Sequence, residues 1–165
     1  MISRHVALLR GLNVGGKNRL PMKELSSLFE GAGCTDVATY IQSGNVVFSS
    51  TDADKAALRV QQEIARLFRF ESPVVTRTAD ELRRVLDVNP FLRAGVPEEQ
   101  LHVAFLRDAP TEAQVASLDP ARSPPDEFSF VGREVFLRMP NGVARSKLTN
   151  AWLDAKLSTT STARN

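Results

Sequence analysis

Apolar and polar positions follow two periods along the chain, and the change from one period to the other separates short strands from helices. Apolar runs such as Val6 to Leu9 suit buried strands. Apolar residues three or four positions apart, as at Ala57, Val60 and Ile64, indicate a helix with one buried side. The pattern predicts strands at 5–9, 37–42, 45–49, 73–76, 101–106, 127–131 and 134–138, and helices that begin near 21, 52, 78, 111 and 146.

The first six elements follow the order β-α-β-β-α-β, which is the split arrangement of a ferredoxin-like unit. We therefore expect an α+β protein of two tandem ferredoxin-like units, with antiparallel sheets and helices packed on one face. The first unit is expected at 1–77, and 78–165 is expected to hold a connecting helix and a second, abbreviated unit. One compact domain is the alternative. The polar tail from Ser158 is expected to fray.

An internal repeat favours two related units. H-V-A-L-L-R from His5 recurs as H-V-A-F-L-R from His102, an offset of 97, and G-N-V-V-F from Gly44 recurs as G-R-E-V-F from Gly132, an offset of 88. The first copy thus carries nine more residues between its matched strands, and they fall naturally in 11–20. A loop lengthened in one copy alone is not needed to close the fold, so we expect function there.

The lengthened loop is rich in glycine, asparagine and positive charge. From Arg10 to Arg19 it reads R-G-L-N-V-G-G-K-N-R, and the first acid of the chain is Glu24. Such loops present backbone N–H groups and positive charge to anions. In this topology the tip of the hairpin at 42–45 lies beside the end of the first strand, and 139–147 repeats the same chemistry before a predicted helix start. The candidate ligand-binding residues are Arg10, Asn13, Gly15, Gly16, Lys17, Asn18, Gln42, Ser43, Gly44, Asn45, Asn141, Arg145, Ser146 and Lys147.

The loop has two other interpretations. A P-loop is disfavoured by the residues themselves, and a purely structural turn stays open. Gly11 to Asn18 spells G-x-x-x-x-G-K-N, one residue from a phosphate-binding P-loop, in which a Ser or Thr after the Lys holds magnesium. Asn18 offers an amide instead, and the predicted helix starts only at Pro21, which argues against a nucleotide hydrolase. The glycines and asparagines are also explained by a tight turn that needs left-handed residues.

Four motifs resemble a known family. L-R-G-L-N-V-G-G-K-N at 9–18, Y-I-Q-S-G-N-V-V-F at 40–48, N-P-F at 89–91 and P-N-G-V-A-R-S-K-L-T-N at 140–150 are similar to the bacterial family known only as domain of unknown function 1697. The resemblance covers nearly the whole chain in the same order. It implies an α+β architecture of ferredoxin-like units and supplies no established activity. The family pattern continues beyond Asn165 with a Trp and a closing helix, so a shortened tail is expected here.

Composition narrows the setting and the partners. With 42% hydrophobic and 24% charged residues, the chain has the composition of an ordinary globular protein. Cys34 is the only cysteine, which suits a reducing compartment, and no apolar run approaches the ~20 residues of a membrane span, so we expect a cytoplasmic protein without membrane contact. Neither His5 nor His102 has a metal-ligating residue at a typical spacing, so no metal is expected. No cofactor is expected either. Cys34 follows a helix-ending glycine and has no histidine nearby in sequence, so it is interpreted as structural, and Trp152 is expected in the core.

The sequence therefore predicts binding of a small anionic or phosphorylated ligand, with a nucleotide as one option, and assigns no reaction. Non-sequence-specific nucleic-acid binding is an alternative, although Tyr40 and Phe48 are the only aromatic residues near the loop and no RNA-recognition signature is present. A protein-assembly module that pairs strand edges, for example in a homodimer, is the other alternative.

Overall fold

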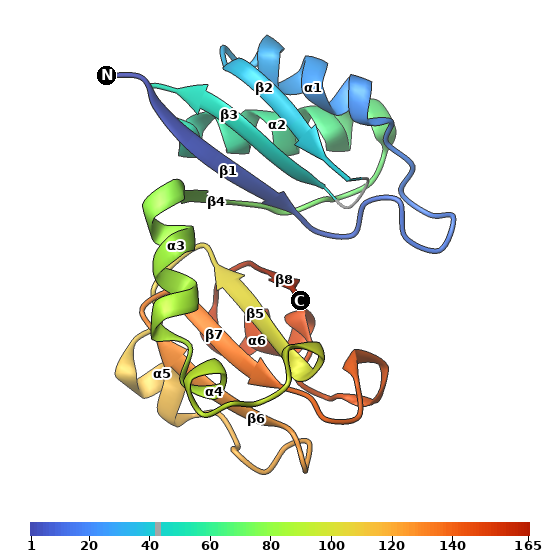
Figure 1. Ribbon diagram of the computed structural model, residues 1–165. Helices are drawn as coiled ribbons and strands as arrows, with labels where there is room; N and C mark the ends of the chain where they lie inside the picture. The colour runs from blue at the N-terminus through green and yellow to red at the C-terminus, as the bar shows by residue number, and fades with distance from the viewer. Residues whose placement is uncertain (42–43) are drawn as a thin grey trace. The chain divides into compact units, whose positions relative to one another are not determined.

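The computed structural model describes residues 1–41 and 44–165 (Figure 1). Its contacts divide the chain into two compact units, Met1–Leu82 and Arg83–Asn165. The expected α+β class is confirmed, because each unit contains a four-stranded antiparallel sheet together with helices. The sequence placed the division after residue 77, whereas the contacts place it after Leu82, inside a helix.

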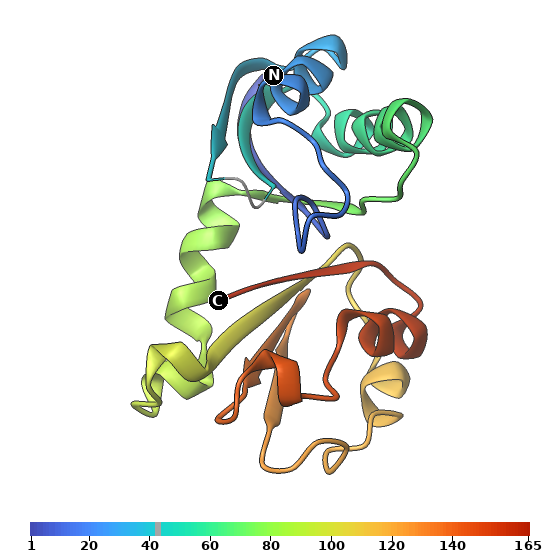
Figure 2. The ribbon, with the colours of Figure 1, turned by 90° about the vertical axis from the view of Figure 1, so that its right-hand side faces the viewer.

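The first unit has the sheet order β2-β3-β1-β4, with both neighbours of the central strand β1 antiparallel to it. Figure 2 shows its two helices on the same side of this sheet. Its elements are β1 (Ser3–Leu9), α1 (Met22–Gly31), β2 (Thr35–Tyr40), β3 (Asn45–Ser50), α2 (Ala53–Phe68) and β4 (Val74–Thr78), and α3 (Ala79–Val88) follows.

Alternation of side chains builds the core of the first unit. Ala7 and Leu9 on β1 and Phe48 on β3 point toward the helices, where they meet Phe29 of α1 and Ile64 of α2 in one buried cluster. The amphipathic helix predicted from 52 begins where expected, because the Asp52 side chain caps it by accepting from the backbone N–H of Lys55 at 3.1 Å.

The second unit has the order β6-β7-β5-β8 and the same succession of strands and helices. Figure 2 shows α5 and α6 on one side of its sheet and α4 on the other. Ala104, Leu137, Leu148 and Trp152 belong to its buried cluster. Its elements are α4 (Pro90–Arg93), the 3₁₀ turn Glu98–Gln100, β5 (Leu101–Leu106), α5 (Glu112–Ala116), β6 (Glu127–Val131), β7 (Glu134–Arg138), the 3₁₀ turn Val143–Arg145, α6 (Asn150–Leu157) and β8 (Ser161–Arg164).

The tail is the clearest correction to the sequence analysis. Instead of fraying from Ser158, it forms β8, which pairs with β5 from Leu106↔Ser161 to Val103↔Arg164. The second unit is therefore not abbreviated in its strands, because it has four of them like the first. Its strand β8 is polar in sequence and owes its conformation to the pairing with β5.

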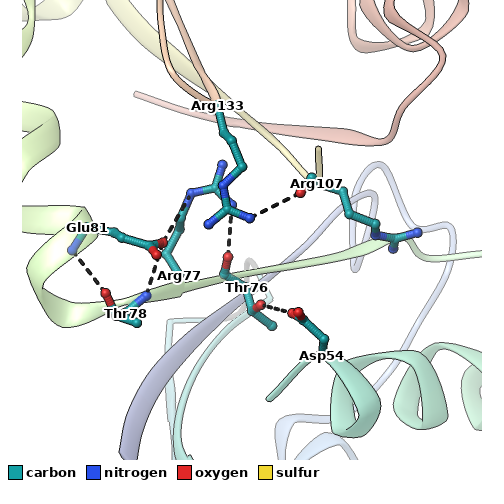
Figure 3. Close-up of polar contacts among 7 residues, drawn as sticks. All are labelled: Asp54, Thr76, Arg77, Thr78, Glu81, Arg107 and Arg133. Atoms are coloured by element: carbon teal, nitrogen blue, oxygen red, sulfur yellow. Dashed lines mark hydrogen bonds and ion pairs between the residues drawn. The ribbon is translucent and has the colours of Figure 1, made fainter. Parts of the chain in front are cut away.

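The last helix also begins later than predicted. The sequence pattern predicts a start near Ser146, but the Ser146 hydroxyl accepts from the backbone N–H of Leu148 at 3.0 Å in a local turn. Thr149 is the residue that caps α6, with its hydroxyl accepting from the N–H of Trp152 at 3.2 Å. The two predicted capping boxes are present, at Thr78 to Glu81 and at Thr111 to Gln114 (Figure 3 shows the first).

The repeat found in the sequence is shifted by one residue at its second match. In the first unit Phe48 lies opposite His5, but Phe136 lies opposite Val103, and Leu137 lies opposite His102. The reason is the turn: Gly132 is the first of two residues that connect β6 and β7, whereas Gly44 is the last residue before β3. A shift of one residue moves a side chain to the other face of a sheet, so Leu137 and not Phe136 joins the cluster under the helices.

Two findings concern the described residues as a whole. No helix among them is long and apolar enough to cross a bilayer. No group of three or more metal-ligating side chains lies together in the part of the chain that the structure describes. Cys34 is buried in the core, which agrees with its structural interpretation, and burial raises the pKa of its thiol.

Candidate functional site

The lengthened loop is a small hairpin, 13–18, which we call the finger. The backbone N–H of Asn13 donates to the carbonyl oxygen of Asn18 at 3.1 Å, and that of Lys17 donates to Val14 at 3.0 Å. The two residues at the tip, Gly15 and Gly16, have φ values of 60° and 74°. Positive φ at both central residues is the geometry of the turns that close two-residue hairpins, and glycine adopts it without strain.

Asparagine side chains fix the base of the finger. The Asn13 amide nitrogen donates to the carbonyl oxygen of Leu20 at 3.0 Å, and its amide oxygen accepts from the N–H of Leu20 at 2.9 Å. The Asn18 amide nitrogen donates to the carbonyl oxygen of Gly11 at 3.0 Å. Both asparagines have positive φ, 54° and 53°, which this residue type tolerates best after glycine. These two predicted site residues therefore shape the loop itself.

Apolar and polar anchors attach the finger to the sheet. Leu12 and Leu20 flank it and are buried in the core of the first unit. The backbone N–H of Arg10 donates to the carbonyl oxygen of Pro73 at 3.1 Å, and the Arg10 carbonyl accepts from the Ser72 hydroxyl at 2.8 Å. The finger thus projects from a base held on both sides.

The tip of the finger carries exposed positive charge and donors. Gly15, Gly16, Lys17 and Arg19 are all exposed. Among the described residues, the backbone N–H groups of both glycines and the side chains of Lys17 and Arg19 have no hydrogen-bond or ion-pair partner. Arg10, at the end of β1, is half-buried. This arrangement suits attraction of an anion, because donors and positive charge lie within one short stretch of chain that contains no acid.

The structure brings the start of β3 to the same end of the sheet as the finger (Figure 1). The N–H of Leu9 donates to the carbonyl oxygen of Gly44 at 2.9 Å, and Asn45 lies opposite Leu8. A Cβ on Gly44 would lie 3.0 Å from the Leu9 Cβ and 3.2 Å from the Leu12 Cδ1, so glycine is required for this close approach. The topological argument from sequence thus places Gly44 and Asn45 correctly. Gln42 and Ser43, also predicted site residues, lie outside the described residues.

The remaining predicted site residues belong to the second unit. Asn141, Arg145 and Lys147 are exposed, and Ser146 is half-buried. The backbone of Lys147 is fixed from two sides, since its N–H donates to the Ser123 hydroxyl at 2.9 Å and its carbonyl accepts from the Arg122 Nε at 2.9 Å. The expected helix N-terminus is absent here because α6 begins only at Asn150. A helix N-terminus therefore gives no reason to expect anion binding at these residues.

A P-loop interpretation of 11–18 does not fit the local fold. The finger leads through Leu20 and Pro21 before α1 begins at Met22, so the helix does not follow directly from Lys17. The neighbours of β1 are antiparallel, whereas a P-loop follows a strand of a parallel sheet. The loop is instead a closed hairpin, as the turn interpretation predicts.

The two aromatic residues near the loop differ in a way the sequence analysis missed. Phe48 is 0% exposed and packs against Phe29 with ring centroids 5.1 Å apart, so it cannot contact a ligand. Tyr40 is 69% exposed at the end of β2. The alternation along 45–49 was the available signal, because it puts Phe48 on the same side as the buried Val46.

An apolar groove of about 430 Å³ lies in the second unit between α5 and the β6–β7 hairpin. Its lining includes Pro110, Val115 and Phe130, and Glu112 is its one charged lining residue. A groove with an acid and without a cation does not suit an anionic ligand. The finger in the first unit therefore remains the better candidate site.

The fold and the finger define an α+β protein with two four-stranded antiparallel sheets and a basic hairpin at one sheet end. The family described as "Protein of unknown function (DUF1697)" matches residues 2–136, and the chain belongs to this family. No curated protein matches the chain.

A solved structure is similar over the whole chain. It is described as the conserved bacterial protein SP0830 from Streptococcus pneumoniae, with 23% sequence identity and a TM-score of 0.69. The similarity covers 100% of this chain and 93% of that one. At this identity the likeness concerns the fold alone.

Proposed function

We propose that this protein binds a small anionic or phosphorylated ligand at the finger of the first unit. One observation carries the proposal: the tip of the finger has two N–H groups without a partner among the described residues, and the side chains of Lys17, beside the tip, and Arg19, directly after the finger, are exposed. Backbone N–H groups and nearby cations are the donors that proteins use for phosphates and carboxylates. Arg10 adds a third cation at the base of the loop.

The other residues of the loop have two structural roles: the asparagines fix its shape, and the glycines leave its tip accessible. Asn13 and Asn18 hold the hairpin in one geometry through bonds to Leu20 and Gly11. A loop that is already ordered loses less conformational entropy when it binds a ligand. Gly15 and Gly16 keep the tip free of side chains, so that a ligand approaches the backbone closely.

We also infer that both units are ferredoxin-like and form a tandem pair. In each unit the sheet order, counted by strand within the unit, is second, third, first, fourth. Equivalent arginines on the fourth strands support this: Arg77 donates to the carbonyl oxygen of Thr76 and Arg164 to that of Ala163, each at 2.9 Å. We also propose a cytoplasmic location, because a chain whose only cysteine is Cys34 forms no disulfide of its own and suits a reducing compartment.

The proposal is tested by thermal unfolding with a panel of probes: inorganic phosphate, inorganic triphosphate, citrate and sugar phosphates. A probe at about 100 times its dissociation constant adds roughly 2.7 kcal/mol of stability, which raises the midpoint by several degrees. We expect the double variant Lys17→Ala/Arg19→Ala to lose this response.

The matched control is Lys55→Ala/Arg59→Ala, which removes the same charge from exposed positions of α2. It should respond to the probe as the parent protein does. If both double variants keep the parent's response, the finger is not the site. If both lose it equally, the attraction comes from the overall charge of the protein.

A further inference from the structure

The sheet face that the helices leave uncovered carries an aromatic side chain at the same end of the sheet as the finger. Tyr40 lies opposite Asn45, and Asn45 lies opposite Leu8. Residues directly opposite in an antiparallel sheet point to the same face. Val46 points into the core beneath the helices, so the neighbouring Asn45, and Tyr40 with it, point to the opposite face.

The Tyr40 ring is available on this face. It is 69% exposed, and within the described part of the chain it has no hydrogen-bond or ring-stacking partner. The next row on the same face consists of Ala38, which is exposed, and Val47, which is half-buried. These short apolar side chains place apolar surface in the row beside the exposed tyrosine.

We propose that Tyr40 stacks on the base of a nucleoside di- or triphosphate whose phosphates are held at the finger. The inference rests on the proposed function and names the class of ligand for that same site. Two strand spacings, roughly 10 Å, separate Tyr40 from Leu8, and the chain enters the finger's base two residues later. A ligand that reaches both Tyr40 and the finger needs an aromatic end and an anionic end. It must also be longer than a phosphate or carboxylate group alone.

A single exposed ring favours a mononucleotide over a nucleic-acid strand. Proteins that bind single strands stack successive bases on several aromatic side chains. Here the chain has one Tyr and one Trp, Trp152 lies in the core of the second unit, and Phe48 is fully buried. One base therefore has a platform on this face of the first unit.

The test compares two ligands that share their phosphates, ATP and inorganic triphosphate, by calorimetric titration of the full chain without added metal. We expect ATP to bind roughly 5- to 150-fold more tightly, which is the range that stacking one base on an aromatic ring supplies. Tyr40→Ala should lower the ATP affinity to that of triphosphate and leave triphosphate unchanged. Tyr40→Phe keeps the ring and should retain most of the ATP affinity.

A spectroscopic measurement reports the contact directly. Because the chain contains one tyrosine, the ring signals of tyrosine-labelled protein in NMR spectra belong to Tyr40. They should shift with ATP and stay in place with triphosphate.

The outcomes separate the two proposals. If neither ligand binds the parent protein, the anion site itself is wrong. If both bind equally and Tyr40→Ala changes nothing, the anion site stands and the stacking proposal is overturned. If a short single-stranded oligonucleotide binds far more tightly than ATP, with a steep dependence on salt, the ligand is a nucleic acid and the mononucleotide assignment is overturned.

Discussion

The two units end their central strands with the same hydrogen bonds and then diverge. In the first, the N–H of Leu9 donates to Gly44, and in the second the N–H of Leu106 donates to Arg133, each at 2.9 Å. Where the first unit has a glycine and continues into the finger, the second has an arginine, which donates through Nη1 to the carbonyl oxygen of Arg107 at 3.1 Å (Figure 3). The equivalent carbonyl of the first unit, that of Arg10, accepts from the Ser72 hydroxyl at 2.8 Å. A side chain thus satisfies the strand end in both units, but only in the second does it come from the turn residue that replaces Gly44.

This difference shows which part of the first unit is not required by the fold. After β5 the chain needs only 107–111 to reach α5, so the finger at the corresponding place of the first unit is not needed to join a strand to a helix. Its exposed donors have no partner among the described residues, whereas Arg133 in the second unit bonds to its own backbone neighbourhood. The connection that follows the central strand is therefore a candidate binding site in the first unit and a short link in the second.

The largest expected effect comes from Gly44→Ala. Gly44 has φ +82°, and a Cβ there would lie 3.0 Å from the Leu9 Cβ and 3.1 Å from the Leu9 carbonyl oxygen. Strain and overpacking together should cost about 2–4 kcal/mol of unfolding free energy. Gly132→Ala is the matched control, with φ +58° and its nearest atom, Glu134 Oε2, at 3.7 Å, and should cost only about 1 kcal/mol. Urea unfolding measures both, and equal losses would contradict the close approach.

Asn13→Ala should have the next largest effect. It removes both side-chain bonds to Leu20, and we expect a loss of about 1–3 kcal/mol. Asn13→Gly keeps the backbone at φ 54° without strain and so isolates the contribution of the bonds. Hydrogen exchange at the amide of Leu20 should accelerate in both variants. Unchanged exchange would show that the finger does not depend on its asparagine.

The helix starts give a smaller contrast. The Thr111 hydroxyl accepts from the N–H of Gln114 at 3.1 Å, while α1 begins after Pro21 without a side-chain cap. Thr111→Ala should therefore cost about 1 kcal/mol in urea unfolding. Thr111→Ser keeps the hydroxyl and should restore most of the loss. A full loss with serine would mean that the methyl group, and not the cap, matters.

The smallest expected effect concerns pH and His102. Burial lowers the pKa of His102, so the folded protein favours the neutral ring. As the pH falls below the ordinary histidine range near ~6.5, the unfolded chain takes up the proton first, and stability decreases. His102→Gln should make the decrease between about pH 7 and pH 5 shallower, as measured by urea unfolding at each pH. Parallel curves for the variant and the parent would contradict this.

Local patterns in the sequence predicted the elements well. The strands at 127–131 and 134–138 match β6 and β7 residue for residue, because alternation and a two-residue turn are both visible in consecutive letters. The caps at Asp52 and Thr111 were visible for the same reason. The position of Gly44 beside the first strand followed from topology.

What the sequence could not give depends on contacts between distant residues. The polar segment S-T-A-R of β8 becomes a strand through pairing with β5, and the residues of the segment itself do not predict a strand. The one-residue shift of the repeat follows from the turn geometry of each hairpin. The roles of Asn13 and Asn18 depend on bonds to residues seven positions away, which a composition rich in glycine and asparagine does not reveal.

The finger's closure at its base has a consequence for protein engineering. Side-chain hydrogen bonds at its base join Asn13 to Leu20 and Asn18 to Gly11. The sheet therefore does not depend on how many residues are inserted between Gly15 and Gly16. A foreign peptide spliced there would be carried by ends that are already held together. The entropic cost of closing the inserted loop should then grow only with the logarithm of its length. This turn is therefore a suitable site for inserting a peptide that is to be displayed on the surface.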